Sequence, residues 1–430
     1  MISKIQASRS NFYWIKWSKI VIGSILIGFL ASIFALILKH ITENYEHLLF
    51  SKTEQRRFLV FLFPLIGLGI IHFLRLYLFK NKKNKGISEV FDTVYFKKKL
   101  PSYKITSHFI NGFLTVIFGG STGIEVSTVV STATMGELAS TKDSVFKKYK
   151  NMFIGAAIAA GVTILFNSPL AGIFFSYENI LKKRSKIFIV THSVSVAVAY
   201  GVSHLFDEAP LFSTTITTWN YSALPYFVIL SIIAAVYGVY LTLSVINIKK
   251  KFLFNKSPLF QIIFGAILIS SLLFIFPELY GDGYHTIKQL IQNTQHFTIG
   301  YTLLGLAFII LIKPIITAIT LSAGGDGGIF APSIFAGAVL GLLIGLIVKN
   351  YFAPEVYLIN FMVIGVAVTL SATLHAPLTA IFLVCGIFNS YALIIPLISV
   401  VFISKYLARF ILPYTVYTVS FRTLPENNIS

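Results

Sequence analysis

The chain has 430 residues, of which 56% are hydrophobic and 12% are charged, and its net charge is +19. Soluble domains carry about 25% charged residues, so this composition excludes an ordinary soluble protein. Apolar stretches recur at spanning length, such as residues 20–38 and 58–75, and about 20 apolar residues are enough to cross a bilayer as a helix. The sequence therefore predicts an all-α polytopic membrane protein. A transmembrane β-barrel would instead show alternation over segments of about 10 residues.

Residues 1–16 form a basic amphipathic segment at the start of the chain. No small-residue cleavage site precedes the first apolar run, so we expect this segment to be retained as a cytoplasmic leader. A transmembrane domain is expected over 17–420, with a first half at about 17–206 and a second half at about 222–420. A short C-terminal tail is expected at 421–430.

Hydrophobic runs define the helices expected along the chain. We expect spanning helices at residues 17–39, 58–79, 104–118, 187–206, 222–247, 258–276, 301–321, 335–350, 356–371 and 390–407. Shorter helical pieces are expected at 87–97, 125–140, 152–165, 170–182, 282–293, 376–388 and 413–420. Many of these short pieces cannot cross a bilayer alone.

The positive charge is concentrated between the apolar segments, at residues 80–104, 142–150, 182–186 and 249–256. Cytoplasmic loops of membrane proteins carry such an excess of lysine and arginine. We therefore interpret the charge as a sign of membrane orientation and not of nucleic-acid binding. The same side chains could touch anionic lipid headgroups or concentrate anions at a cytoplasmic entrance.

Two pairs of similar segments indicate an internal repeat. GGSTGIEVS (119–127) resembles GGDGGIFAP (324–332), with three glycines and an isoleucine in one register 205 residues apart. FNSPLAGIFF (166–175) resembles LHAPLTAIFL (374–383) at an offset of 208 residues. Because both pairs keep the same order and nearly the same offset, the chain is expected to contain two related halves.

Interrupted hydrophobic segments at corresponding positions of two halves point to a transporter's binding site. The first N–H groups of a helix lack intrahelical partners, and together with the helix dipole they favour an anion. Glycine lets the backbone approach an ion closely. Two such helix starts, one from each half, could therefore meet around one anion at the middle of the membrane.

These segments resemble the CLC family of chloride channels and chloride/proton antiporters, in its prokaryotic type without cytoplasmic regulatory domains. Residues 123–127 (GIEVS) are similar to the family's G-R-E-G-P segment, and residues 328–332 (GIFAP) match its G-x-F-x-P segment. Residues 167–172 (NSPLAG) and 375–380 (HAPLTA) are similar to its N-A-P-L-A-G and R-A-P-L-T-G segments. The resemblance implies about eighteen helices in two inverted repeats with broken and re-entrant helices. It also implies one pore per subunit and a homodimer.

The resemblance assigns roles to residues in these motifs. Glu125 is expected to be the gating glutamate, which enters the anion site when the site is empty and carries the proton in antiporters. The alternative is a glutamate placed by the first turn of a helix. Tyr417 is expected to donate its hydroxyl to the central anion; the alternative is an aromatic residue at the membrane interface. Further anion contacts are expected from the segments around Gly123, Ile124, Gly328, Ile329 and Phe330.

The match to the family is imperfect at the first motif and beside the acid. Val126 and Ser127 replace the glycine and proline that follow the glutamate, and valine is stiff at χ1. In the family's G-S-G-I-P segment, Lys85 takes the place of the serine and is followed by Gly86. Lys85 either adds a positive charge to the anion site or extends to the cytoplasmic surface, the interpretation that we favour.

Two acidic positions also depart from the family. Antiporters of the family carry two adjacent acids after the P-L-A-G segment, and the second is the inner proton relay. Here Glu178 is followed by Asn179, and asparagine cannot take a proton. Glu178 is a possible relay, although the family's first acid is usually structural. Asp326 lies in the second glycine loop, where we expect it to face solvent because a carboxylate would repel an anion.

Transport of a small monovalent anion, most simply chloride, is the function that these residues favour, with fluoride or nitrate as alternative substrates. Proton-coupled antiport and passive conduction both remain open, so protons are a possible second partner. A membrane enzyme is disfavoured because there is no nucleophile–His–acid set and no pair of histidines with metal-ligand spacing. Cys385 is the single cysteine, which excludes an intrachain disulfide. We expect no cofactor or metal, and a location in a bacterial inner membrane.

Overall fold

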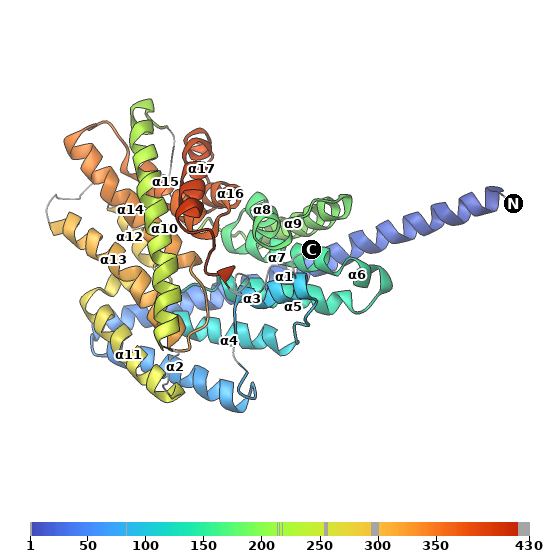
Figure 1. Cartoon of the computed structure of the whole chain (residues 1–430), viewed down its shortest axis with the longest axis horizontal. Coiled ribbons are helices and arrows are strands. Elements are labelled where there is room, and N and C mark those ends of the chain that lie inside the picture. The colour runs from blue at the N-terminus through green and yellow to red at the C-terminus, as the bar shows by residue number, and fades with distance from the viewer. Residues whose placement is uncertain are drawn as a thin grey trace.

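The computed structural model describes residues 2–82, 84–212, 214, 216, 218–252, 257–293 and 301–419, with side chains described from residue 13 in the first helix and from 303 in α13. The predicted tail at 421–430 lies outside the described residues. Seventeen α-helices form the first and second halves of the described chain (Figure 1). In the first half these are α1 (Ile2–Gln55), α2 (Leu59–Tyr77), α3 (Ile87–Phe96), α4 (Tyr103–Ile117), α5 (Glu125–Ser140), α6 (Ser144–Lys148), α7 (Lys150–Phe166), α8 (Pro169–Phe175) and α9 (Lys186–Leu205).

The second half contains α10 (Leu224–Phe252), α11 (Pro258–Ile275), α12 (Tyr284–Gln292), α13 (Tyr301–Ser322), α14 (Phe330–Tyr351), α15 (Leu358–Leu374), α16 (Pro377–Ile387) and α17 (Ile394–Ile411). A π-helix, η1 (Ser176–Leu181), continues α8 directly, and short 3-10 turns occur at η2 (Tyr221–Ala223) and η3 (Pro277–Leu279). Eight of the described helices are long and apolar enough to cross a membrane. The chain is therefore the polytopic, all-helical protein that its hydrophobic runs predict.

Most expected helices form within a few residues of the predicted bounds, but four details differ. α1 is continuous from Ile2 to Gln55, so the leader boundary at residue 16 falls inside a helix. α14 begins at Phe330 instead of 335 because the glycine-rich turn before it ends there. The short helix α6 was not predicted, and residues 413–418 do not form the expected helix.

The two halves repeat the same helix break. α7 ends at Asn167, whose φ is 48°, and α8 starts at Pro169. α15 ends at His375, whose φ is 56°, and α16 starts at Pro377. A left-handed residue ends each first helix, and a proline suits the first position of each second helix. Both breaks have the offset of 208 residues seen in the sequence, so the repeat has a structural counterpart.

The halves pack against each other through α8 and α16. Phe174 stacks on Phe382 with ring centroids 5.2 Å apart, and the Ser168 hydroxyl donates to the Phe382 carbonyl at 2.7 Å. Helix α14 is buried over most of its length and packs on α15. A methyl group at Gly341 of α14 would collide with the Phe361 carbonyl of α15, so this glycine permits the close approach of the two helices.

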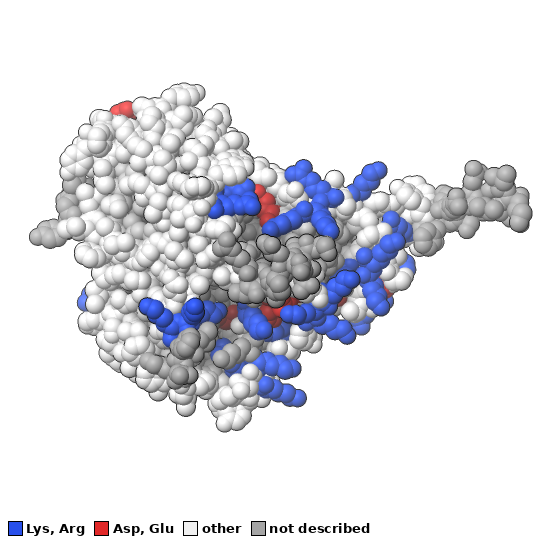
Figure 2. Space-filling model, in the orientation of Figure 1, with Lys and Arg blue, Asp and Glu red and all other residues white. Residues whose placement is uncertain are grey.

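Charged side chains are unevenly distributed over the surface. Figure 2 shows lysines and arginines gathered in a band, in the part of the view where Figure 1 places α3, α6, α8 and α9, while large areas carry no charge. The uncharged areas include many exposed leucine, isoleucine and phenylalanine side chains on the long helices. Such apolar surface is suited to lipid, and the basic band is suited to the cytoplasmic side of a bilayer.

Candidate anion-binding site

The two glycine-rich turns of the repeat meet in the interior of the protein. Gly123 and Gly328 form an isolated antiparallel bridge. Directly after this bridge, α5 begins at Glu125 and α14 begins at Phe330. The first intrahelical hydrogen bonds are donated by the N–H groups of residues 128 and 333, so the earlier N–H groups of each helix have no partner within it. The structure thus brings two helix N-termini, one from each half, to one place.

Glu125 occupies the junction between these turns. Its side chain is buried, with 3% exposed. Oε1 accepts a hydrogen bond from the Tyr284 hydroxyl at 2.6 Å, and Oε2 has no hydrogen-bond partner among the described residues. A methyl group at Gly123 would collide with this carboxylate and would lie 2.6 Å from the Ala331 Cβ. The backbone N–H groups of Glu125 and Ala331 face the carboxylate, so the acid lies where N–H groups of both helices converge.

Tyr417 reaches the same region from the C-terminal segment. Its hydroxyl accepts a hydrogen bond from the Ile329 N–H at 3.2 Å, and the side chain is 9% exposed. A methyl group at Gly328 would lie 2.7 Å from this hydroxyl. The hydroxyl and the Ile329 N–H are therefore two neighbouring donors that an anion placed beside them could share. The structure places Tyr417 in the protein interior, which argues against the alternative of an interfacial aromatic residue.

Val126 fills the space between the first motif and the second glycine turn. Gly86 has a φ of 66°, and a methyl group on it would lie 3.3 Å from Val126 Cγ1. A methyl group on Gly328 would collide with Val126 Cγ2. The branched side chain thus lies against Gly86 on one side and Gly328 on the other. Where the related motif has glycine, this chain places two methyl groups.

Lys85 does not bring its charge to the site. Its side chain is exposed, and its backbone N–H donates to Glu89 Oε1 at 2.5 Å. In this structure the Lys85 ammonium does not contact the candidate site. The side chain extends to the surface, where water solvates its charge. Its neighbour Gly86 does reach the site through its contact with Val126.

The expectation that Asp326 faces solvent is wrong. Asp326 is buried, with 6% exposed, and its Oδ2 lies 3.0 Å from His108 Nδ1 and accepts from Asn84 Nδ2 at 2.5 Å. Arg75 anchors the same loop by donating to the Gly324 carbonyl at 2.9 Å. Buried charges are stable when they are paired and hydrogen-bonded, so Asp326 holds the second glycine turn in place.

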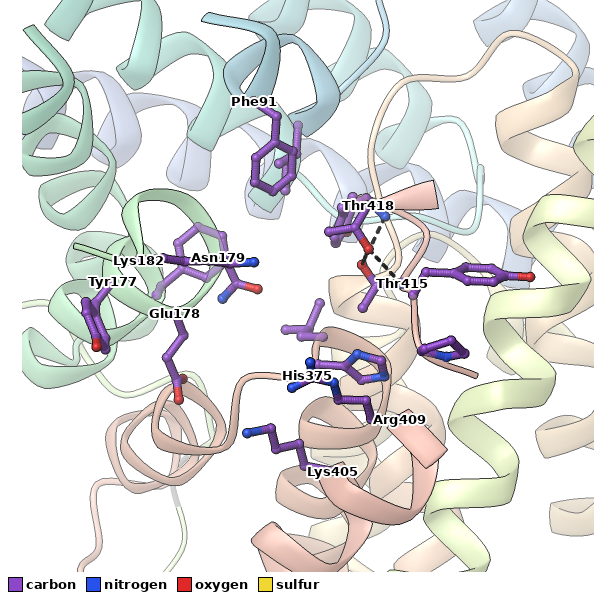
Figure 3. A pocket seen from close by; sticks show the side chains of 16 residues that line it. Phe91, Tyr177, Glu178, Asn179, Lys182, His375, Lys405, Arg409, Thr415 and Thr418 are labelled. Atoms are coloured by element: carbon purple, nitrogen blue, oxygen red, sulfur yellow. Dashed lines mark hydrogen bonds between the residues drawn. The ribbon is translucent and has the colours of Figure 1, made fainter. Parts of the chain in front are cut away.

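A cavity of 670 Å³ has Tyr417 among its lining residues, and Figure 3 shows the charged side chains that line it. Three of its lining residues, Lys182, Lys405 and Arg409, are cationic, and His375 lies near them. Lys405 and Arg409 are four residues apart on α17, which places them on one face of that helix. A concave wall with this charge raises the local concentration of anions. Tyr417 lies at the wall of the cavity, so the cavity connects solvent to the candidate site.

Glu178 and Asn179, which follow the P-L-A-G segment at the expected inner proton site, make different contacts. Glu178 accepts from the Leu378 N–H at 3.2 Å, from the Thr379 N–H at 2.8 Å and from the Thr379 hydroxyl at 2.7 Å. These hydrogen bonds give acceptors to the first N–H groups of α16, so Glu178 has a structural role at the start of that helix. Asn179 lines the cavity, and its Nδ2 has no hydrogen-bond partner in the described part of the chain.

Sequence reasoning missed Tyr284, Lys405 and Arg409. Tyr284 carried no motif signal, although it follows Gly281-Asp282-Gly283, and both glycines have positive φ. The pair on α17 did leave a signal, because two basic residues four apart in an apolar helix indicate a polar face. Only the fold shows that Tyr284 contacts Glu125 and that Lys405 and Arg409 line the same cavity as Tyr417.

Comparisons with known proteins match this geometry. The model of a family described as voltage gated chloride channel matches residues 65–409, so the chain belongs to that family. A curated relative, the H(+)/Cl(−) exchange transporter ClcA of Salmonella arizonae, is 28% identical over 339 residues, which are 74% of this chain and 69% of the relative. The ClcA of Salmonella newport is 29% identical over the same shares of the two chains.

Solved structures agree with the fold. A slow cyanobacterial Cl−/H+ antiporter has a TM-score of 0.80 at 19% identity, over 95% of this chain and 99% of the other. A CLC-type fluoride/proton antiporter has a TM-score of 0.76 at 22% identity, over 93% of this chain and 97% of the other. The predicted CLC-like fold is confirmed.

Proposed function

We propose that this protein transports a small monovalent anion, chloride in the first instance, across the membrane. The path runs from the basic cavity past Tyr417 and Val126 to Glu125, which acts as the gate. The observation that carries the proposal is the meeting of two helix N-termini at the Gly123–Gly328 bridge, with a buried carboxylate between them. The curated relatives named as H(+)/Cl(−) exchange transporters support it.

The geometry gives each group a step in transport. Lys182, Lys405 and Arg409 attract the anion into the cavity. The Tyr417 hydroxyl and the first-turn N–H groups of α5 and α14 replace part of its hydration shell. The Glu125 carboxylate lies beside the N–H groups at the far end of this path, so an anion can pass only when the carboxylate moves away. Protonation removes the negative charge that holds it there.

The coupling to protons has two candidate forms, each with an observation in its favour. Glu178 is engaged at the start of α16 and Asn179 cannot carry a proton, which favours anion conduction with little proton movement. The relatives' names favour exchange of chloride for protons. A cavity that admits water could relay protons to Glu125 without a second acid.

One reconstitution experiment tests the anion and the coupling together. Proteoliposomes loaded with chloride, fluoride or nitrate are diluted into medium without that anion, and efflux and internal pH are followed in parallel. We expect chloride efflux above that of empty liposomes. Uphill proton movement driven by the chloride gradient identifies an exchanger, and its absence during efflux identifies passive conduction. Absence of efflux for all three anions contradicts the proposal.

We also propose that the protein is a homodimer in a bacterial inner membrane, with one path in each subunit. The resemblance to the CLC family, which implies a homodimer with one pore per subunit, supports this assembly. Cross-linking in native membranes tests the assembly: a single cross-linked species at twice the subunit mass is expected. Monomers alone at every cross-linker concentration would exclude the dimer.

A further inference from the structure

Tyr284 makes a contact with the gate that neither glycine turn supplies. It is the first residue of α12, and its hydroxyl donates to Glu125 Oε1 at 2.6 Å. Both side chains are buried, with 9% of Tyr284 and 3% of Glu125 exposed. A short hydrogen bond between a hydroxyl and a buried carboxylate is among the stronger side-chain contacts in proteins. Tyr284 is therefore placed to decide where the Glu125 carboxylate rests.

The backbone around Tyr284 is fixed by two carboxylates. Asp282 Oδ1 accepts from the Tyr284 N–H at 2.8 Å. The Asp282 N–H in turn donates to Glu46 Oε1 at 3.1 Å, which ties the loop to α1. Gly283, with a φ of 84°, lies directly against the Phe335 ring of α14, so the turn that aims Tyr284 requires glycine at this position.

A buried lysine and an aromatic ring complete the support. Lys313 of α13 is fully buried, and its Nζ donates to the carbonyls of Leu279 and Gly281 at 3.5 Å each. The Tyr284 ring packs edge-on against Phe212 with centroids 5.8 Å apart. Because α1, α13 and the segment before α10 all hold this loop, the hydroxyl is presented to Glu125 by a rigid frame.

The ring of Tyr284 also lines a second cavity, of 130 Å³, distinct from the basic one. Its titratable and charged lining residues are Glu43, Glu46, His47, Tyr280, Asp282, Tyr284, His285 and Lys288. Lys313 lies behind the loop and completes the charged groups around Asp282. Three carboxylates in so small a space disfavour an anion and favour a proton. Tyr284 thus stands between an acidic cavity and the gate.

We propose that Tyr284 is a positioning residue that holds the Glu125 carboxylate in its closed position and is released when a proton arrives from the acidic cavity. The inference rests on the proposed function, in which Glu125 is the gate. The arriving proton is added to a carboxylate oxygen of Glu125, and the Tyr284 hydroxyl keeps its own proton. The charge-assisted hydrogen bond becomes a neutral one of roughly half the strength, so the side chain is free to leave the N–H groups.

The test is the dependence of anion flux on the pH of the solution that reaches the acidic cavity. In proteoliposomes, Tyr284→Phe removes the donated hydrogen bond while keeping the ring. We expect the pH midpoint of chloride flux to move to higher pH by about one unit, because a hydrogen bond to the charged carboxylate no longer opposes protonation. Tyr237→Phe is the matched control, since the buried Tyr237 hydroxyl donates to the Ile310 carbonyl at 2.9 Å and lines neither the basic nor the acidic cavity. It should leave the midpoint unchanged.

Testing Tyr284→Phe in the Glu125→Gln variant separates the role of Glu125 as the gate from the role of Tyr284. In Glu125→Gln there is no carboxylate to hold, so adding Tyr284→Phe should change neither the flux nor its pH dependence. If Glu125→Gln alone behaves as the unmodified protein, the proposed gate itself is wrong. If Glu125→Gln alters the pH profile but the profile of Tyr284→Phe overlaps that of the unmodified protein, the role of Tyr284 is overturned. If Tyr284→Phe is poorly recovered, Tyr284→Leu, which also lacks the hydroxyl, must shift the pH midpoint of chloride flux in the same direction.

Discussion

At the residue scale, Val126 changes the candidate site by its side chain, while the glycine-rich turn before α5 is retained. Its two methyl groups face Gly86 and Gly328, at the place where the related motif has glycine. Protein interiors are packed closely enough that one methyl group is felt. In the proposed path, Val126 therefore takes up space between Gly86 and Gly328, and the room left there depends on these two glycines.

Gly328→Ala should block the path. The added methyl group would collide with Val126 Cγ2 and lie 2.7 Å from the Tyr417 hydroxyl, so we expect chloride flux from proteoliposomes to fall roughly tenfold or more. Adding Val126→Ala removes the colliding methyl group and should restore part of the flux. Gly69→Ala is the control, because a methyl group at Gly69 meets nothing within 4 Å. Unchanged flux in Gly328→Ala would show that the anion does not pass this point.

Sequence alone predicted some residues of the site and missed others for a physical reason. Glu125, Ile329 and Tyr417 lie in or near recognisable segments, and the structure brings them together. The solvent position expected for Asp326 was wrong, because the partner His108 lies more than two hundred residues away in the chain and only the fold brings it near. Tyr284 was missed for the same reason, since its contact with Glu125 joins residues that no local pattern connects.

At the scale of elements, the break between two helices occurs once in each half. α7 and α8 are interrupted by a left-handed residue and a proline, and α15 and α16 repeat this. Each break leaves a helix start inside the protein whose N–H groups need a partner. Ser168 serves the start of α8, and Glu178 reaches across from the first half to serve the start of α16.

Glu178→Ala should therefore destabilise the protein. The N–H groups of Leu378 and Thr379 would lose their acceptor in a partly buried place, which costs about 1–2 kcal/mol of unfolding free energy. Glu178→Gln retains a carbonyl oxygen and should cost less. Thermal unfolding in detergent measures both. If Ala lowers proton movement without lowering the unfolding temperature, Glu178 is a proton relay and the structural role is wrong.

The two cations on α17 should govern how fast anions enter the basic cavity. Lys405→Gln combined with Arg409→Gln removes two of the three lysine or arginine charges that line it, and we expect chloride flux at low salt to fall roughly tenfold. The loss should shrink as salt rises, because ions screen the cavity charge. Lys147→Gln with Lys148→Gln on α6, where both side chains are exposed, is the matched control. Equal losses in both pairs would mean that the cavity is not the entrance.

For the molecule as a whole, the internal repeat predicted more of the architecture than any single helix did. The offsets of 205 and 208 residues in the sequence reappear as the Gly123–Gly328 bridge and as the paired breaks at Asn167 and His375. Most helix bounds followed from hydrophobic runs. The hydrophobic runs could not predict that α8 packs on α16, because an apolar side chain can face either lipid or another helix.

At the scale of the whole molecule, two of the cavities lined by described residues differ in charge. A basic cavity reaches Tyr417, and an acidic cavity reaches Tyr284. Glu125 contacts Tyr284, at the acidic cavity. Under the proposed function, this arrangement suits a protein that draws anions from the basic cavity and takes up protons from the acidic one.

Chloride efflux and internal pH, measured together in proteoliposomes containing the unmodified chain or Glu125→Gln, test the central claim most directly. Glutamine keeps the shape of the gate without its charge, so we expect Glu125→Gln to conduct chloride at every pH with no accompanying proton movement. The unmodified chain should conduct more as the pH falls. Equal flux and equal pH dependence in the two proteins, or no anion flux in either, would contradict a path gated by Glu125.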